Sequence, residues 1–296
     1  MIKVIAVDMD GTLLNEKNDI SEETLEAIRK AEEAGIEMII ATGRGYHYAM
    51  SALEKHPFKR RYLLMSGGEV RDEQERIERQ ILLGYDTILN LYKICQKYHV
   101  MVHFCGDEFD YAVGTEAEIY EGMCKELCSF TGFSREEITG SKIFKAMFGR
   151  IREMKTIEEI QNYAVFKAFI FSDDETMLAE LDRELMRIPD IASASSFPTN
   201  LEITDIRAQK GLILKDMVET RGYSLDEVMA LGDSLNDESM LAMPIGAPVA
   251  MGNAHEKLKK ICPYCTKTNV EHGVAYAIEK VLEGRLEDLR NPEYEP

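Results

Sequence analysis

The residues best suited to chemistry follow the first apolar segment, where positions 8–12 read Asp-Met-Asp-Gly-Thr. The preceding run, Ile2–Val7, is rich in β-branched side chains and is typical of a buried strand. Ligands of open α/β sheets bind beyond the carboxyl ends of the strands, and this motif lies at such an end. Asp8 and Asp10 would repel each other there unless a cation lay between them, and carboxylate oxygens suit Mg²⁺. Gly11 permits a sharp turn that brings its own N–H and that of Thr12 toward an anion.

Two other interpretations of this motif are weaker. An EF-hand loop also has spaced aspartates and a glycine, but it needs a third acid, a terminal Glu and helical flanks. Here the flank is a predicted strand. A solvated turn is the second alternative, since Asp and Gly are ordinary turn residues. The motif alone favours a chemical role over either of them.

Other predicted elements also end in reactive side chains. Thr42 follows the second predicted strand, Asp233 and Asp237 follow a later one, and Lys210 begins a helix. Three converging carboxylates need a cation, and Mg²⁺ with a lysine would make them a phosphoryl-transfer site. Thr42 and loop N–H groups would then hold the remaining phosphate oxygens, and a carboxylate such as Asp8 could act as a nucleophile. Each feature is weak alone, but four in this order indicate one site.

Composition places limits on the class of protein. The 296 residues are 45% apolar and 30% charged, which predicts a globular chain with a large core and two domains. A net charge of −18 argues against nucleic acid or an anionic membrane as the partner. The chain shows no basic-then-apolar leader and no apolar run long enough to span a bilayer, so we expect a cytoplasmic protein. Without a secretory signal, the six cysteines are expected to be reduced, and Cys262-Pro-Tyr-Cys265 to be ordinary thiols rather than a redox or zinc pair.

The order of elements predicts a doubly wound parallel α/β sheet with a second unit inserted into it. Strand and helix alternate to about position 82, and the alternation resumes near 204. Between them, a hairpin at 100–113 and further strands predict an α+β unit with antiparallel pairing. We therefore expect a core of residues 1–82 plus 204–296 and an inserted domain of residues 83–203. The expected elements are helices 22–34, 46–55, 86–98, 175–187, 209–220 and 273–282, a helix that contains Ile119, Met123 and Leu127, and strands 2–7, 36–41, 62–65, 100–104, 109–113, 165–171, 191–197, 201–204, 228–231 and 248–251. The stretch 135–159 has no clear pattern, and the tail 291–296 is expected to fray.

Four of these segments together resemble the ordered motifs of the haloacid dehalogenase-like phosphatases. They are Asp-Met-Asp-Gly-Thr at 8–12, Ala-Thr-Gly-Arg at 41–44, Lys-Gly at 210–211 and Gly-Asp-Ser-Leu-Asn-Asp at 232–237. More closely, the chain is similar to the Cof-type branch, which has a large α/β cap inserted after the third core strand. The segments Ala-Met-Gly-Asn-Ala at 250–254 and Gly-Val-Ala at 273–275 also match that branch. The resemblance covers nearly the whole chain.

The resemblance implies a role for each matching residue. Asp8 would be the nucleophile, and Asp10 would protonate the leaving oxygen and then activate water. Mg²⁺ would be bound by Asp8, the backbone carbonyl of Asp10 and Asp233, with Asp237 acting through water or as a support. The transferring phosphate and the substrate would be bound by Gly11, Thr12, Thr42, Gly43, Lys210 and Asn236, with Asn253 as a weaker site-lining candidate. Lys210 would also be catalytic, because it would orient Asp8.

The resemblance also implies a function and leaves alternatives open. It implies a Mg²⁺-dependent phosphatase acting through an aspartyl-phosphate on a small metabolite, most often a sugar phosphate, with pyridoxal phosphate and flavin mononucleotide as other candidates. The cap would select the substrate. Phosphohexomutases share this scaffold and are the alternative, followed by a non-catalytic ligand sensor. One departure concerns specificity: Ser66-Gly67-Gly68 replaces the usual Asn-Gly-Ala after the third strand. The chain is expected to act as a monomer or a homodimer.

Overall fold

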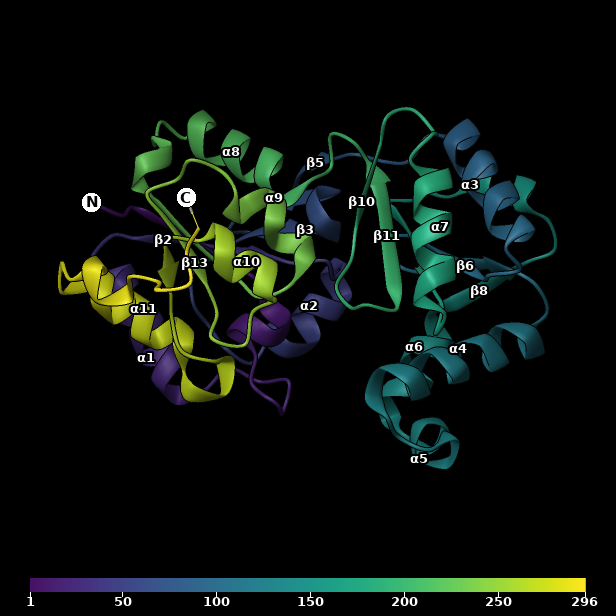
Figure 1. Cartoon of the computed structure of the whole chain (residues 1–296), viewed down its shortest axis with the longest axis horizontal. Coiled ribbons are helices and arrows are strands. Elements are labelled where there is room, and N and C mark those ends of the chain that lie inside the picture. Colours follow the sequence, from purple (N-terminus) through teal and green to yellow (C-terminus); the bar gives the residue numbers. More distant parts are fainter. Residues whose placement is uncertain (296) are drawn as a thin grey trace. The chain divides into compact units, whose positions relative to one another are not determined.

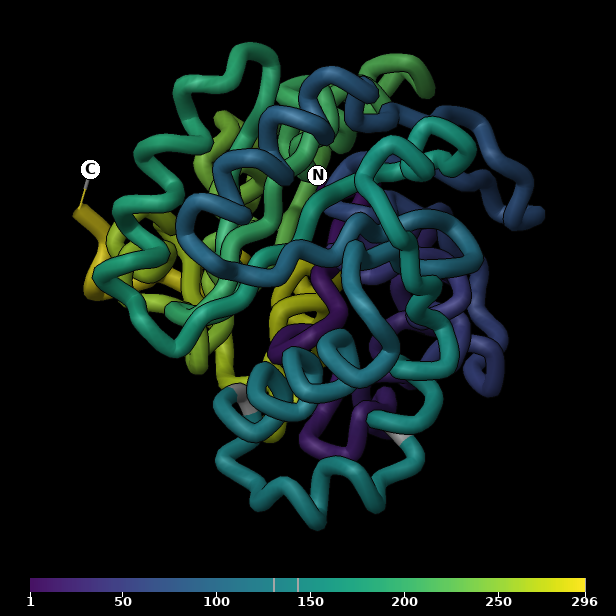
Figure 2. Tube along the Cα trace, turned by 90° about the vertical axis from the view of Figure 1, so that its right-hand side faces the viewer, coloured from purple at the N-terminus to yellow at the C-terminus, as the bar shows by residue number. Residues whose placement is uncertain are grey.

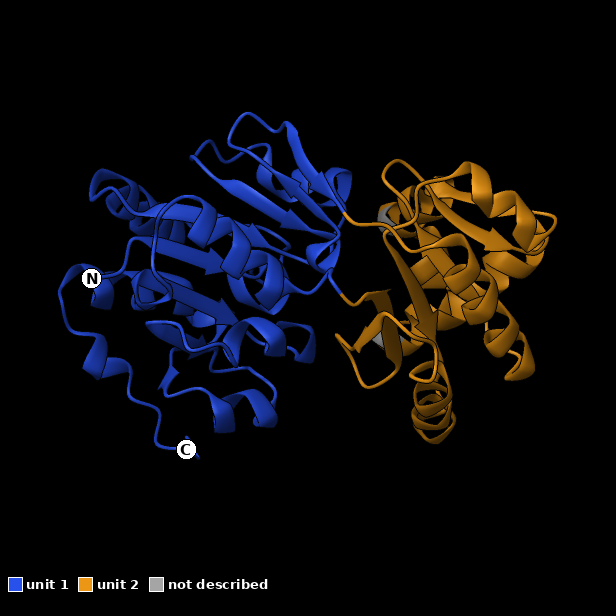
Figure 3. Cartoon of the chain, turned by 90° about the horizontal axis from the view of Figure 1, so that it is seen from above, with its two compact units in different colours: residues 1–80, 207–296 blue, residues 81–206 orange. Residues whose placement is uncertain are grey.

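The chain folds into two compact units, which Figure 3 shows in different colours. The computed structural model describes residues 1–295, with the side chains of Phe130 and Ile143 left out of the description. The first unit comprises Met1–Gln80 and Arg207–Pro296, and the inserted unit comprises Ile81–Ile206.

An eight-stranded sheet forms the centre of the first unit, in the order β14-β13-β12-β1-β2-β3-β4-β5. The strands from β14 to β3 run parallel, whereas β4 and β5 add an antiparallel hairpin at one edge. All four residues of β1 are buried, because its Val-Ile-Ala-Val sequence is covered on both faces. The strands are β1 Val4–Val7, β2 Glu37–Ala41, β3 Arg61–Leu64, β4 Glu69–Arg71, β5 Ile77–Gln80, β12 Val228–Gly232, β13 Ala247–Ala250 and β14 Tyr264–Cys265.

Helices cover both faces of this sheet, as Figure 1 shows, with α1 and α11 packed together on one side and α8 and α9 on the other. Ser21 begins α1 as its N-cap and accepts a hydrogen bond from the Thr24 N–H, as its sequence position predicts. Gly35, with a φ of +78°, follows the end of that helix. The helices are α1 Glu22–Glu33, α2 Tyr46–Leu53, α8 Lys210–Thr220, α9 Glu238–Leu241, α10 Glu256–Ile261 and α11 Gly273–Leu282.

A six-stranded sheet forms the inserted unit, in the order β10-β11-β9-β6-β7-β8. Its pairs are antiparallel except for β7 with β8. Apolar residues of α3 and α7 join those of β6, β9 and β11 in one core, whereas α4, α5 and α6 share a smaller cluster and lie side by side in Figures 1 and 2. The elements are α3 Tyr85–Lys97, β6 Val102–Cys105, β7 Asp110–Val113, α4 Glu116–Thr131, α5 Arg135–Gly140, α6 Lys142–Arg150, β8 Ile151–Met154, β9 Lys167–Phe171, α7 Glu175–Leu185, β10 Ile191–Ala194 and β11 Asn200–Asp205.

The expected α/β fold with an inserted α+β unit is confirmed, although three segments differ from their prediction. The hairpin β4–β5 was missed because its strands carry mixed charges and β5 is exposed throughout, so no apolar alternation marks them. The unassigned stretch contains α5, α6 and β8. The frayed-tail prediction is wrong for residues 291–295, since the Asn291 amide donates to the carbonyls of Lys259 and Cys262 at 2.6 and 2.8 Å. In the described part of the chain, the helices are too short or too polar to cross a membrane.

Close packing of α8 on α9 yields a first prediction, which concerns stability. A Cβ added at Gly211 would lie 1.9 Å from the carbonyl oxygen of Ser239. We expect Gly211→Ala to destabilise the protein by about 1–3 kcal/mol, because two backbones must separate. The adjacent Leu212 is 52% exposed, so Leu212→Ala in the same helix should change the free energy of unfolding by less than about 1 kcal/mol. Urea unfolding followed by circular dichroism measures both, and equal midpoints for the two variants would contradict this account of the packing.

Candidate active site

The end of β1 places Asp8 at the centre of the first unit. Its backbone N–H donates to the Leu231 carbonyl of the neighbouring strand β12 at 3.0 Å, and the side chain is buried. The ammonium of Lys210, at the start of α8, donates to Asp8 Oδ1 at 2.6 Å. The sheet and the helix thus fix the carboxylate from two directions.

Lys210 also binds a second buried carboxylate. Its Nζ donates to Asp237 Oδ1 at 2.6 Å, and the other oxygen of Asp237 accepts the N–H groups of Asp233 and Ser234 at 3.0 and 3.2 Å. A Cβ at Gly232 would lie 2.5 Å from this carboxyl group, so the glycine permits the loop to fold onto it. Both oxygens of Asp237 are therefore used in holding the lysine and the loop after β12.

Asp233 lies against the first motif. Its Oδ1 accepts a hydrogen bond from the Thr12 hydroxyl at 2.9 Å. Gly11 has a φ of +75°, and a Cβ there would lie 2.3 Å from Asp233 Oδ2. Glycine is thus required at position 11 both by the left-handed backbone and by the approach of the aspartate.

The carboxylates of Asp8, Asp233 and Asp237 form a cluster in which one oxygen of each lies within 4.8 Å of the others. With the ammonium of Lys210 the formal charge of the group is −2, and such an arrangement of oxygen ligands fits a divalent cation. Burial and the repulsion of Asp237 raise the pKa of Asp8 well above its usual range, and the same two causes raise the pKa of Asp233 to about 7. Burial alone would lower the pKa of Lys210, but the attraction of Asp237 and Asp8 raises it above its usual value.

The loop after β2 carries Thr42 and Gly43, and it is tied to the loop after β3. The Thr42 hydroxyl oxygen accepts the Arg44 N–H at 3.1 Å, which leaves its own proton available to an anion. The N–H of Ser66 donates to the Thr42 carbonyl and that of Met65 to the Arg44 carbonyl, both at 3.0 Å. Met65 and Ser66 have φ values of 51° and 58°, a conformation that costs energy for non-glycine residues. The unusual Ser-Gly-Gly segment therefore directly supports the threonine loop.

Two asparagines predicted to line the site have supporting contacts in the same unit. Asn253 donates to the Gly11 carbonyl at 2.8 Å and accepts the Asn269 N–H at 3.0 Å. Asn236 accepts a hydrogen bond from the Ser234 hydroxyl at 2.9 Å, within the loop that holds Asp233. Asn253 thus fixes the turn of the first motif from the C-terminal part of the chain.

Asp10 differs from the other three aspartates. Its carboxylate is paired with the guanidinium of Arg44, with Nε donating to Oδ2 at 2.8 Å and Nη2 to Oδ1 at 2.5 Å. Sequence reasoning placed Arg44 in a motif but gave it no role. The available signal was its position, two residues after Thr42 in a loop expected at the same sheet edge.

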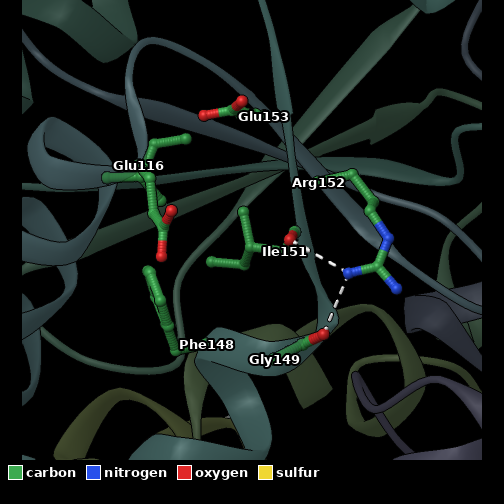
Figure 4. A pocket seen from close by; sticks show the side chains of 7 residues that line it. Glu116, Phe148, Gly149, Ile151, Arg152 and Glu153 are labelled. Atoms are coloured by element: carbon green, nitrogen blue, oxygen red, sulfur yellow. Dashed lines mark hydrogen bonds between the residues drawn. The ribbon is translucent and has the colours of Figure 1, made fainter.

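Two further features of the chain contribute none of the predicted site residues. A cavity of 320 Å³ in the inserted unit, shown in Figure 4, is lined by Glu116, Ile119, Phe148, Gly149, Ile151, Arg152 and Glu153. Cys262 and Cys265 are free thiols, and burial raises the pKa of Cys262 to about 12 and that of Cys265 above its usual value. A protonated thiol is a poor nucleophile and a poor metal ligand.

Comparisons with known proteins relate the chain to one family. A family profile described as haloacid dehalogenase-like hydrolase matches residues 5–278. Phosphatase YwpJ of Bacillus subtilis is 31% identical over 297 residues, which cover 95% of this chain and all of the relative. The 5-amino-6-(5-phospho-D-ribitylamino)uracil phosphatase YcsE of the same organism is 30% identical over 94% of both chains. A solved haloacid dehalogenase-like hydrolase from B. subtilis superposes with a TM-score of 0.81 at 27% identity, covering 94% of this chain and 99% of that one.

The raised pKa of Asp233 yields a prediction about pH and cations. Because this pKa is about 7 in the folded protein and 3.8 ordinarily, the folded state holds an extra proton between these values. Without a cation, this contribution to stability is fully present below about pH 4 and is lost as the pH rises through 7. Mg²⁺ must displace that proton, so the rise in Tm on adding MgCl₂ should be larger at pH 8 than at pH 5.5.

Thermal unfolding with and without MgCl₂ at the two pH values measures this effect. Asp233→Asn should remove most of the Mg²⁺-dependent rise in Tm. Asp216→Asn is the matched control, because the Asp216 side chain is 48% exposed and pairs only at the surface with Arg79. A rise in Tm that is equal at both pH values, or unchanged in Asp233→Asn, would contradict cation binding at this cluster.

Proposed function

The chain belongs to the haloacid dehalogenase-like hydrolase family, and from this membership we propose that it is a Mg²⁺-dependent phosphatase that hydrolyses a small phosphorylated metabolite through an aspartyl-phosphate on Asp8. One observation carries the proposal. Lys210 hydrogen-bonds the carboxylates of both Asp8 and Asp237 in the buried interior, with Asp233 beside them. Two buried acids, a partly buried third acid and one buried lysine at the carboxyl ends of β1 and β12 suit a phosphoryl-transfer site.

In the first half-reaction, Asp8 attacks the phosphorus of the substrate. Lys210 holds Oδ1 of Asp8, so the other carboxylate oxygen forms the new bond to phosphorus. The bond from phosphorus to the leaving oxygen breaks, and Asp10 donates a proton to that oxygen. The Thr42 hydroxyl and the N–H groups of the Gly11 and Gly43 turns bind the phosphate oxygens in this proposal.

In the second half-reaction, water attacks the phosphorus of the aspartyl-phosphate. Asp10 takes the proton from water as the new bond forms, and the bond between phosphorus and Asp8 breaks with its electron pair returning to the carboxylate. The products are inorganic phosphate and the original Asp8 carboxylate. The same residue thus acts as an acid and then as a base, because donating its proton in the first step leaves the carboxylate that takes the proton from water in the second.

The acidic cluster is the proposed Mg²⁺ site. Asp8, Asp233 and the backbone carbonyl of Asp10 would bind the ion directly, and Asp237, whose two oxygens are already hydrogen-bonded, would support it. When bound, Mg²⁺ supplies positive charge that neutralises phosphate oxygens as negative charge shifts in the transition state.

Relatives suggest the substrate class. YcsE is named for a phosphorylated ribityl chain on a uracil ring, which is a polyol phosphate. This supports a sugar or polyol phosphate as the first choice, with pyridoxal phosphate and flavin mononucleotide tested beside it. We assign the selection of the leaving group to the inserted unit, Ile81–Ile206, because the proposed phosphate-binding and proton-transfer residues all belong to the first unit.

Release of inorganic phosphate from a panel of metabolites, with and without Mg²⁺, tests the proposed function. Wild type should release phosphate from a few compounds only when Mg²⁺ is present. Asp8→Asn keeps the side-chain shape but removes the nucleophile, so turnover should fall about 10³-fold or more. Asp216→Asn is again the matched control and should keep full activity.

Two results would contradict the proposal. Retained turnover in Asp8→Asn would exclude Asp8 as the nucleophile. Activity that requires a sugar bisphosphate activator and transfers the phosphoryl group back to the substrate would instead identify a phosphohexomutase.

A further inference from the structure

Arg44 is strongly paired at the proposed active site, yet the catalytic scheme gives it no task. We propose that Arg44 is a positioning residue, which holds the carboxylate of Asp10 away from the cation-binding aspartates and oriented for proton transfer. This inference rests on the proposed function, because it concerns how Asp10 performs its part of that reaction.

Several contacts fix the guanidinium before it reaches Asp10. Nη1 donates to the Tyr48 carbonyl at 3.3 Å, and Nη2 donates to Asn18 Oδ1 at 2.6 Å as well as to Asp10. The Arg44 backbone is bonded through its N–H to Thr42 and through its carbonyl to Met65. The Arg44 side chain is 20% exposed and that of Asp10 is 56% exposed. Arg44 is therefore the anchored partner, and Asp10 is the one it restrains.

The loop that carries Asn18 is folded so as to present this amide. Asn18 has a φ of 56°, a left-handed conformation that asparagine tolerates better than most residues. Its N–H donates to the Asn15 carbonyl, and the Asn15 N–H donates to the Asp19 carbonyl, both at 2.9 Å. The Asn15 side chain also accepts the Lys17 N–H. The tight turn thus delivers the Asn18 amide oxygen to Arg44 from a segment that directly follows the first motif.

Charge separates the four aspartates into two groups. Asp10 is close enough to Asp8 and Asp233 to repel their carboxylates. A free fourth carboxylate at that distance would compete for a place on a cation. The ion pair with Arg44 offsets the Asp10 charge, while Asp8 and Asp237 both pair with Lys210.

Geometry favours the same division of roles. Two hydrogen bonds from Nε and Nη2 form a planar fork, which fixes the plane of a carboxylate as well as its position. A proton-transfer group needs a fixed orientation toward the water or leaving oxygen. A lysine at position 44 would supply charge without this fork.

Steady-state kinetics on an aryl phosphate measure the role of Arg44 in the step in which water attacks. This substrate is chosen because its leaving group needs little protonation. Arg44→Ala should lower kcat about 10- to 100-fold and change KM by less than about threefold. Arg44→Lys should restore only part of the lost kcat, since it keeps the charge and loses the fork. Arg29→Ala is the matched control and should leave both constants unchanged, because Arg29 is an exposed residue of α1 bonded to the Leu25 carbonyl of its own helix.

A double-mutant cycle shows whether Arg44 acts through Asp10. In an Asp10→Asn background, Arg44→Ala should lower kcat by no more than about twofold, because the group it positions has lost its function. Asn18→Gly, which keeps the left-handed backbone and removes the amide, should lower kcat less than Arg44→Ala does and should likewise have no effect on Asp10→Asn.

The outcomes separate this inference from the proposed function. A rise in KM at constant kcat for Arg44→Ala, or an equal loss in the Asp10→Asn background, would show that Arg44 contacts the substrate directly and would overturn the inference alone. A wild-type protein that releases no phosphate would overturn both proposals.

Discussion

The rest of the first unit depends on the pairing of the Lys210 ammonium with the carboxylates of Asp8 and Asp237. A buried charge that loses its partner costs several kcal/mol, so the carboxylates of Asp8 and Asp237 must both reach it. These three residues come from the start of α8, the end of β1 and the loop after β12. Their pairing therefore joins segments that lie far apart in the sequence, and it requires the glycines at 211 and 232 where backbones and side chains approach closely.

Pairing with a single lysine leaves the cluster of Asp8, Asp233 and Asp237 with an excess of negative charge. Three clustered carboxylates and one lysine carry a formal charge of −2, and burial together with the repulsion among the carboxylates raises the pKa values of Asp8 and Asp233. A protein optimised only for stability would not keep such a cluster, since replacing buried charges with apolar residues is often neutral or stabilising. The cost makes sense if the cluster binds a divalent cation and a phosphate. The charges of Arg44 and Asp10 cancel within their own ion pair, so this pair does not add to the excess of negative charge at the cluster.

The acids and the lysine of the cluster all lie in the first of the two units. The chain leaves the first unit after the hairpin β4–β5, builds Ile81–Ile206 around a separate core, and returns just before Lys210. Every predicted site residue belongs to the first unit, so the inserted unit can vary without disturbing the acids and the lysine. YwpJ and YcsE, which are 31% and 30% identical to this chain, match it over nearly its whole length, the inserted unit included.

The sequence by itself determined the order of the core elements and the positions of the reactive residues. Buried parallel strands are short apolar runs and their ends are abrupt, so Asp8, Thr42 and Asp233 could be placed at one edge from local patterns alone. Tertiary structure decided which partners these residues have. Asp237 proved to hold Lys210, and Arg44 proved to hold Asp10, because such pairs depend on the distance between segments that no local pattern records. The hairpin β4–β5 escaped sequence reasoning because its mixed polar and charged residues show no apolar alternation. The tail at Asn291 escaped it because hydrogen bonds to carbonyls about 30 residues away in the sequence fix it.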